Sequence, residues 1–100
     1  MSVRLIVRPE AEGDILDAAL WYEGREVGLG LELTAEIRAA VERALENPLA
    51  YLLLRKQPHV RRILARRFPY RIFYVVRPDA MIVFAVLHAA QDERHWLDRL

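Results

Sequence analysis

Apolar residues recur along the first half of the chain with the spacing of helices. Residues 3–7 are the exception, because this short β-branched run before Pro9 predicts a first strand. Over residues 9–22 apolar side chains return every three or four positions, which predicts a helix with acidic residues in its first turn. The same spacing over residues 33–45 predicts a second helix, which ends at Asn47 before a proline. Joined by a glycine-containing turn, the two helices form a helical hairpin.

The second half of the chain has the patterns of strands. Residues 60–65, 70–76 and 81–87 are short runs rich in β-branched and aromatic side chains, and they predict three strands. Residues 77–80 join the last two with a proline in the second position, which is typical of a tight turn in an antiparallel meander. Both sides of the last two strands are apolar, so the sheet needs cover on both faces. The helical hairpin covers one face, and we expect the C-terminal segment or a partner on the other.

Two segments have weaker patterns. Residues 48–58 are expected to be a loop or irregular, because their LAYLLL run does not distinguish a helix from a strand. A short helix is expected over residues 93–100, and Trp21 and Trp96, at helical positions, are expected in the core. The expected fold class is α+β, in the order β-α-α-β-β-β with a short C-terminal helix, its helical hairpin packed on a mainly antiparallel sheet.

Composition narrows the class of protein. With 100 residues, of which 54% are hydrophobic, we expect one domain over residues 1–100. The N-terminus does not resemble a secretory signal, and no run approaches the ~18 apolar residues of a membrane span, so we expect a cytoplasmic protein that does not bind membranes. Zero cysteines exclude disulfides, thiolate chemistry and cysteine-based zinc sites. His59 and His95 lack the companions of a metal site, and we expect neither a metal nor a cofactor.

Charge is segregated along the chain. Residues 10–46 contain ten acidic side chains against three arginines, a balance of −7, whereas residues 55–77 contain eight basic side chains and no acid. The total of +1 therefore conceals an acidic half, expected to be a solvated face, and a basic half that favours anions.

Short motifs follow one another in order along nearly the whole chain. The predicted helices and turns carry Ala11, Asp14, Ile15, Trp21, Tyr22, Glu23, Gly28, Gly30 and Pro48. The predicted strands carry Val60, Arg61, Arg62, Phe68, Pro69, Tyr70 and Tyr74, then Ile82, Ala85, Val86, Leu87 and His88, followed by Asp92 and Trp96. Each piece is weak alone, but in this order they resemble the RelE/ParE superfamily of toxins from type II toxin–antitoxin modules.

The resemblance implies a cognate antitoxin, ParD-like or similar, as the partner. Five basic residues on the strand and turn over residues 60–71 are the expected partner-binding residues: Arg61, Arg62, Arg66, Arg67 and Arg71. The antitoxin's C-terminal tail is their first expected partner, with gyrase or nucleic acid second. The chain departs from the family at Gln91, where an arginine is common, and this change is compatible with an attenuated, non-toxic antitoxin-binding domain.

The family contains two activities. ParE-like members poison DNA gyrase and need a binding surface, whereas RelE-like members cut mRNA on the ribosome through attack by the 2′-OH. A ribonuclease without metal needs cations for the phosphate and groups that move protons. Its candidates here are Arg62, Arg66, Arg71 and His88, because arginine suits phosphate and His88 titrates near neutral pH.

The acidic helices favour the gyrase-directed interpretation. Lys56 is the only lysine in the chain, and an acidic helical hairpin would be repelled by the phosphates of ribosomal RNA. We therefore expect a toxin that inhibits gyrase without being an enzyme. The ribosome-dependent mRNA endonuclease and the attenuated binding domain remain the alternatives. A lone histidine at the end of a strand, such as His88, is more often a structural residue than a catalytic one.

Overall fold

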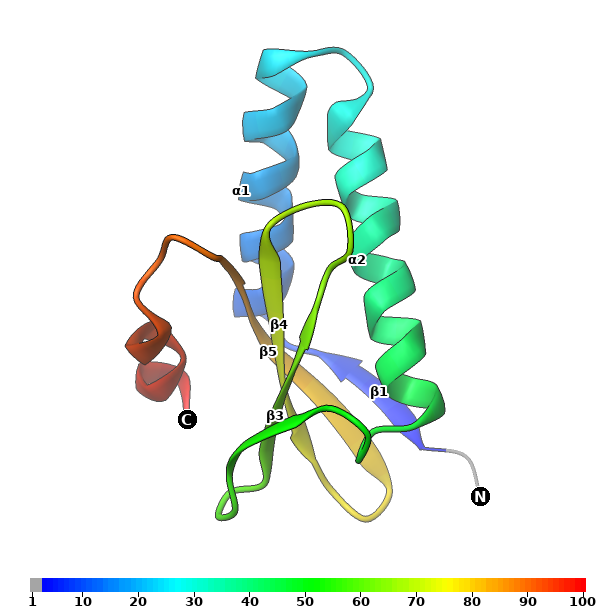
Figure 1. Cartoon of the computed structure of the whole chain (residues 1–100), viewed down its shortest axis with the longest axis vertical. Coiled ribbons are helices and arrows are strands. Elements are labelled where there is room, and N and C mark those ends of the chain that lie inside the picture. The colour runs from blue at the N-terminus through cyan, green and yellow to red at the C-terminus, as the bar shows by residue number, and fades with distance from the viewer. Residues whose placement is uncertain (1–2) are drawn as a thin grey trace.

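The computed structural model describes residues 3–100, with the exception of the Glu93 side chain. Helices and strands follow one another along the chain as β1 (Arg4–Val7), α1 (Pro9–Arg25), α2 (Leu29–Glu46), β2 (Leu52–Arg55), β3 (Val60–Leu64), β4 (Tyr70–Val76), β5 (Ala80–His88) and the 3₁₀ helix η1 (Glu93–Arg99) (Figure 1). The predicted α+β class and the predicted order are confirmed, with one strand more than expected. No described helix is long and apolar enough to cross a membrane.

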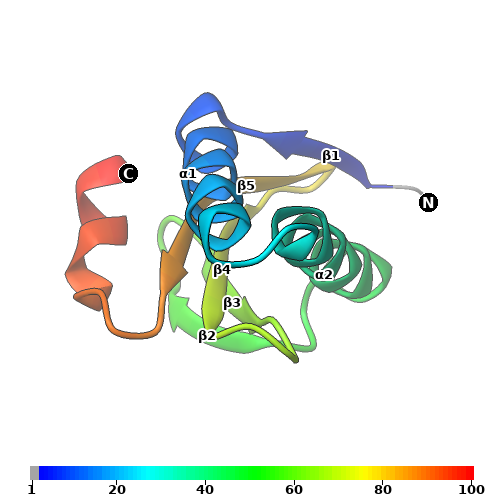
Figure 2. The same ribbon diagram turned by 90° about the horizontal axis from the view of Figure 1, so that it is seen from above.

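The five strands form one mixed sheet in the order β1-β5-β4-β3-β2. Strand β1 pairs with β5 in parallel, and every other pair is antiparallel. Helices α1 and α2 lie side by side over one face, and η1 lies on the other side of β4 and β5 (Figure 2). We call these the helix face and the η1 face. Of the two covers expected for the second face, the C-terminal segment or a partner, the structure shows the C-terminal segment over part of it.

Strand β2 corrects the expected loop. Residues 52–55 pair with β3, with an irregular register between Leu53 and Arg55. The strand was not predicted because its leucines have no period and because its hydrogen-bond partners come from β3. Three of its four residues are exposed, as an edge strand permits.

The hairpin turn is fixed by one carboxylate. Gly28 has a φ of 96°, a conformation that glycine adopts without strain, and it begins α2. The Glu23 carboxylate accepts hydrogen bonds from the N–H groups of Gly28, at 3.0 Å, and Gly30, at 3.0 Å, so α1 caps the N-terminus of α2. A Cβ at Gly30 would lie 2.7 Å from the Ala19 carbonyl oxygen, which explains why the helices approach so closely there.

A β-bulge at Phe84 changes which side chains of β5 face the helices. Phe73 pairs with Ala85 and Tyr74 pairs with Val83, so Phe84 has no opposite residue. Val83 and Val86 consequently both belong to the helix-face core. The bulge thus directs the end of β5, and His88 with it, toward the helices.

Helix η1 is held to the η1 face by aromatic rings and an ion pair. Trp96 is 8% exposed and stacks on Phe73, with ring centroids 6.0 Å apart. The guanidinium of Arg99 donates to both oxygens of Asp14, at 2.5 and 2.9 Å, and these hydrogen bonds raise the pKa of Arg99. Asp14 also accepts from the Val86 N–H, so α1, β5 and η1 meet at one carboxylate.

The predictions for the two tryptophans have opposite outcomes. Trp96 is in the core, as predicted, but Trp21 is 55% exposed and the prediction for it was wrong. The guanidinium of Arg25 covers its ring at 4.4 Å, on the outer side of the hairpin. The helical spacing placed Trp21 next to Tyr22, and Tyr22 takes the inward position against Phe68.

Candidate functional site: the arginines of β3 and β4

The expected partner-binding arginines lie on both faces of the sheet. Side chains alternate along a strand, and Ile63 and Ile72 belong to the helix-face core. Arg62 and Arg71, one position before each of them, therefore lie on the η1 face. Arg61 pairs with Tyr74, whose side chain is in the helix-face core, so Arg61 lies on the helix face. The strand does not present all five cations to one partner.

The turn between β3 and β4 is bound to the acidic helix α2. One oxygen of Glu36 accepts from the backbone N–H of Arg66, at 2.7 Å, and of Arg67, at 3.1 Å. These hydrogen bonds lower the pKa of Glu36. The Arg67 guanidinium also forms an ion pair with Glu32 at 3.1 Å. Some acidic side chains of the first half of the chain therefore bind basic residues of the second half. The acidic helices hold the β3–β4 turn in addition to facing solvent.

Two of the five guanidinium groups hold backbone segments. Arg61 donates to the Tyr51 carbonyl at 2.6 Å and to Nε2 of His59 at 2.8 Å. Burial, together with the charge of Arg61, lowers the pKa of His59. Arg71 donates to three carbonyl oxygens at the end of β5, those of His88, Ala89 and Gln91, at 3.1, 3.3 and 2.8 Å.

The His88 ring lies on the helix face, whereas the side chains of Arg62 and Arg71 lie on the η1 face and Arg71 reaches only the backbone of His88. Its ring meets that of Tyr70 edge-on, with centroids 5.2 Å apart. Nδ1 accepts a hydrogen bond from the Ala90 N–H at 2.9 Å, so in the neutral ring the proton is on Nε2. The structure therefore does not assemble the candidate ribonuclease residues around one point.

Gln91 closes the loop after β5. Its side-chain oxygen accepts from the His88 N–H at 2.7 Å, and its own N–H donates to the His88 carbonyl at 2.9 Å. Its carbonyl oxygen is one of the three that Arg71 binds. The residue that departs from the family pattern thus has a structural role in this chain.

A hollow of about 410 Å³ brings Arg62 and Arg66 together with a third arginine. Arg43, in the last turn of α2, lines the same hollow and donates to the Leu64 carbonyl at 3.3 Å. Arg43 was not among the predicted site residues, because it lies in the sequence of the acidic helix. Its spacing of seven residues from Glu36 places both on one side of α2, and this was the available signal.

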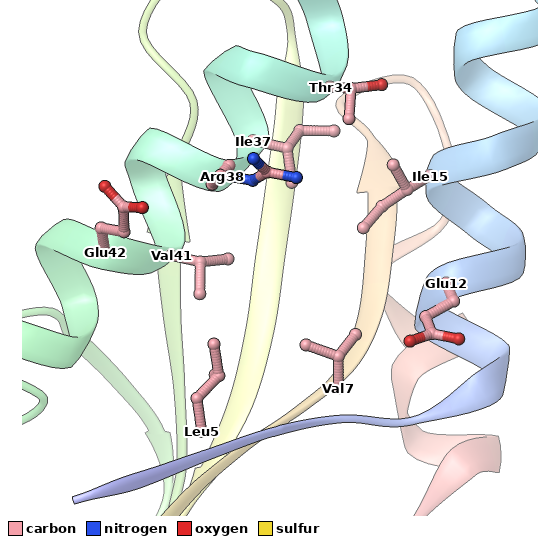
Figure 3. Close-up of a pocket in the computed structure, with 9 residues that line it drawn as sticks. All are labelled: Leu5, Val7, Glu12, Ile15, Thr34, Ile37, Arg38, Val41 and Glu42. Carbon is pink, nitrogen blue, oxygen red and sulfur yellow. The ribbon is translucent and has the colours of Figure 1, made fainter.

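An apolar groove lies on the helix side of the molecule, between α1, α2 and β1. Its volume is about 420 Å³, and Figure 3 shows its side chains converging from the three elements. The apolar lining consists of Leu5, Val7, Ile15, Ile37 and Val41, and Glu12, Thr34, Arg38 and Glu42 complete it. No group of three histidines or carboxylates placed to hold a metal occurs within the part of the chain that the structure describes.

Comparison with known proteins places the chain in a family. The family model described as ParE toxin of type II toxin-antitoxin system, parDE, matches residues 5–93. A solved structure of the chromosomal ParDE TA system from P. aeruginosa has the same fold, with a TM-score of 0.70 and 17% identity over 86% of this chain and 95% of that chain. A search of curated proteins found no match. The resemblance to the RelE/ParE superfamily, in its ParE-like branch, is confirmed. The chain belongs to the ParE toxins of type II toxin–antitoxin systems.

Proposed function

We propose that a cognate, ParD-like antitoxin neutralises this toxin, and that the toxin poisons DNA gyrase through a binding surface, without catalysis. Family membership supports the antitoxin as partner. The observation that carries the choice of target is that the His88 ring and the arginine side chains do not face one site. The ring packs against Tyr70 on the helix face, whereas the Arg71 guanidinium is bound to three backbone carbonyls at the end of β5. Cleavage of RNA requires the cations and the proton-transferring groups to converge on one phosphate.

The contacts of the other candidates support the same choice. Arg71 directs its guanidinium at three carbonyl oxygens of its own chain, and Nδ1 of His88 accepts from the backbone. Both side chains therefore stabilise the end of β5. The acidic hairpin repels RNA phosphates, which disfavours docking on ribosomal RNA.

The apolar groove is the proposed seat of the antitoxin. The η1 face already carries η1 over Phe73 and Phe84, whereas the groove leaves apolar side chains of three elements accessible. An amphipathic segment of the antitoxin would bury this lining, with its charges toward Glu12, Arg38 and Glu42. The hollow at Arg62 and Arg66 would accept acidic residues of the antitoxin tail.

The first test is brief expression of the chain without antitoxin, followed by parallel assays for gyrase-trapped DNA breaks and for cleavage of ribosome-bound mRNA. We expect DNA breaks with intact messages. His88→Asn, which keeps a hydrogen-bond acceptor near the position of Nδ1 but removes the titrating ring, should be as toxic as the parent chain. Cleaved messages that disappear in His88→Asn would replace the gyrase proposal with the ribonuclease one.

Co-expression with the antitoxin tests the groove. Leu5→Glu introduces a charge into the lining, and Leu16→Glu introduces the same charge at a site on α1 that is 58% exposed and does not line the groove. The antitoxin should rescue growth with Leu16→Glu and fail with Leu5→Glu. If the chain without antitoxin leaves growth unchanged, the attenuated binding domain is favoured, and Gln91→Arg is the variant that should restore toxicity.

A further inference from the structure

Three arginines from separate segments line a second basic hollow, distinct from the one lined by Arg43, Arg62 and Arg66. Arg8 follows β1, Arg55 ends β2 and Arg77 follows β4, and the hollow between them has a volume of about 310 Å³. Pro58, Val75 and Leu100 complete the lining. We call it the arginine hollow.

The arginine hollow lies on the η1 face, beside the part that η1 covers. Leu5 and Val7 line the apolar groove on the helix side, so Arg4 and Arg8, which alternate with them, face the other way. Val75 belongs to the η1-face core, two positions beyond the Phe73 ring that Trp96 covers. The hollow therefore lies on the η1 face, next to the part of that face that η1 covers.

The charges at this end of the molecule have one dominant sign. Among the lining residues that the structure describes there is no acidic side chain. Arg4 extends the basic surface along β1, and Lys56 extends it after β2. The nearby acids are Asp79, in the β4–β5 turn, and Glu10, two positions after Arg8, whose charge acts on Arg99.

The acidic hairpin turn lies at the opposite end. Figure 1 shows the turn between α1 and α2 at one end of the long axis, and the β2–β3 and β4–β5 turns at the other. The molecule is 40 Å long, and Glu23 and Glu26 lie beside the hairpin turn. A polyanion would therefore meet the basic end first, with the acidic end held away.

We propose that the arginine hollow binds the phosphodiester backbone of DNA. Arginines from three segments line the hollow, and each planar guanidinium can make two parallel hydrogen bonds to a phosphate. Nε of Arg55 donates to the Gln57 carbonyl at 2.8 Å, so the terminal nitrogens of this group would make its contact with the phosphate. The cations on both sides, Arg4 and Lys56, extend the contact to neighbouring phosphates, which a polymer supplies and a single phosphate does not. Pro58, which is half-buried, offers an apolar surface to a deoxyribose beside the guanidinium groups. Contacts of this kind position DNA without reading its sequence.

The inference does not depend on the choice between gyrase and the ribosome, because its test uses only the purified full chain and DNA. The probe is a fluorescein-labelled duplex of mixed sequence, and fluorescence anisotropy measures the dissociation constant between 50 and 200 mM NaCl. In Arg55→Gln/Arg77→Gln, we expect the dissociation constant at low salt to rise about tenfold and the slope of log K against log salt to fall by about two.

The matched control is Arg25→Gln/Arg38→Gln, which removes the same charge from exposed positions on the two helices. It should change the dissociation constant by less than about twofold, because only charges near the phosphates displace counterions. Equal losses in the two double variants would overturn the proposal, since net charge alone would then explain binding. Binding of an oligoglutamate peptide in place of the duplex would also overturn it, in favour of an acidic protein partner.

Amide chemical shifts of the unsubstituted chain provide a second measurement that does not depend on the folding of variants. With increasing duplex, the largest changes are expected at residues 8, 55–58 and 75–77. Changes centred instead on the hollow of Arg43, Arg62 and Arg66 would place the phosphate elsewhere and contradict the proposal.

Discussion

The two faces of the sheet have covers of different size, fastened by different interactions. Helices α1 and α2, of 17 and 18 residues, cover the helix face, and their apolar residues form about half of its core. Helix η1, of 7 residues, covers part of the η1 face with one tryptophan and is fastened by the ion pair of Asp14 and Arg99. A short element can thus serve as a cover where aromatic stacking and charged hydrogen bonds replace buried area.

The largest expected effect compares one core side chain under each cover. Trp96→Ala removes a ring that contacts both Phe73 and Phe84, and Ile37→Ala removes a side chain of α2 that is 1% exposed. Each should lower the free energy of unfolding by about 3 kcal/mol, measured by guanidinium unfolding with circular dichroism. A loss below about 1 kcal/mol for Trp96→Ala alone would mean that η1 detaches without harm to the rest.

The next effect concerns the fastening of η1. Asp14→Asn leaves the Arg99 guanidinium without its carboxylate, and the side chains of the pair are only 16% and 26% exposed. Because a partly buried charge loses its partner, stability should fall by about 2 kcal/mol in the same unfolding assay. Asp17→Asn, on the exposed surface of the same helix, is the control and should change stability little. Similar losses in the two variants would show that helix charge, and not the ion pair, matters.

A smaller effect is expected under the helical cover, at Tyr74. Its hydroxyl donates to the Pro48 carbonyl at 2.7 Å, and burial raises its pKa to about 12. A raised folded-state pKa contributes stability that is complete below the unfolded value of about 10 and is lost as the pH rises to about 12. Tyr74→Phe should cost about 1 kcal/mol at neutral pH and make stability less sensitive to pH between these values.

The control for Tyr74 is Tyr51→Phe, at a half-buried position. Thermal unfolding at pH 8, 10 and 11 compares the two variants with the parent chain. An unchanged alkaline loss in Tyr74→Phe would assign that loss to another group.

The smallest effect is expected at Glu36, which fastens the β3–β4 turn to α2. Hydrogen bonds from Arg66 and Arg67 lower its pKa from 4.5, so its contribution is present above that value and is lost as the pH falls through the folded-state pKa. Glu36→Gln should cost less than about 1 kcal/mol at pH 7, and the difference from the parent chain should vanish in acid. Glu42→Gln, exposed on the same helix, serves as the control in urea unfolding at pH 7 and pH 3.

The parts of the fold that sequence could predict are those with a regular period or a marked end. Pro9 and Asn47 lie at the limits of the hairpin as the spacing indicated, and residues 77–80 join β4 to β5 as predicted, with the Arg77 N–H donating to the Ala80 carbonyl. Strand β2 had no such signal, because its pairing with β3 is a tertiary contact. The bulge at Phe84 was equally invisible, and it determines which face His88 reaches.

The candidate site was predicted in its residue types and only partly in its geometry. The run of arginines over residues 61–71 marked a basic region, but alternation and internal contacts divide it between two faces and several backbone carbonyls. Arg43 and the arginine hollow come from elements far apart in the sequence, so neither has a local pattern. Composition therefore indicated an affinity for anions, and only the fold indicates where the cations gather.

Both edge strands of the sheet carry arginines, and this has a consequence for self-association. Strands β1 and β2 are four residues long, and each could offer unpaired backbone groups to a strand of another molecule. Arg4 begins β1, Arg8 follows it and Arg55 ends β2. A strand added at either edge would have to strip water from these cations, which opposes edge-to-edge polymerisation. Two of the side chains that line the arginine hollow, Arg8 and Arg55, therefore also lie at the edges of the sheet, where charge disfavours the addition of a sixth strand.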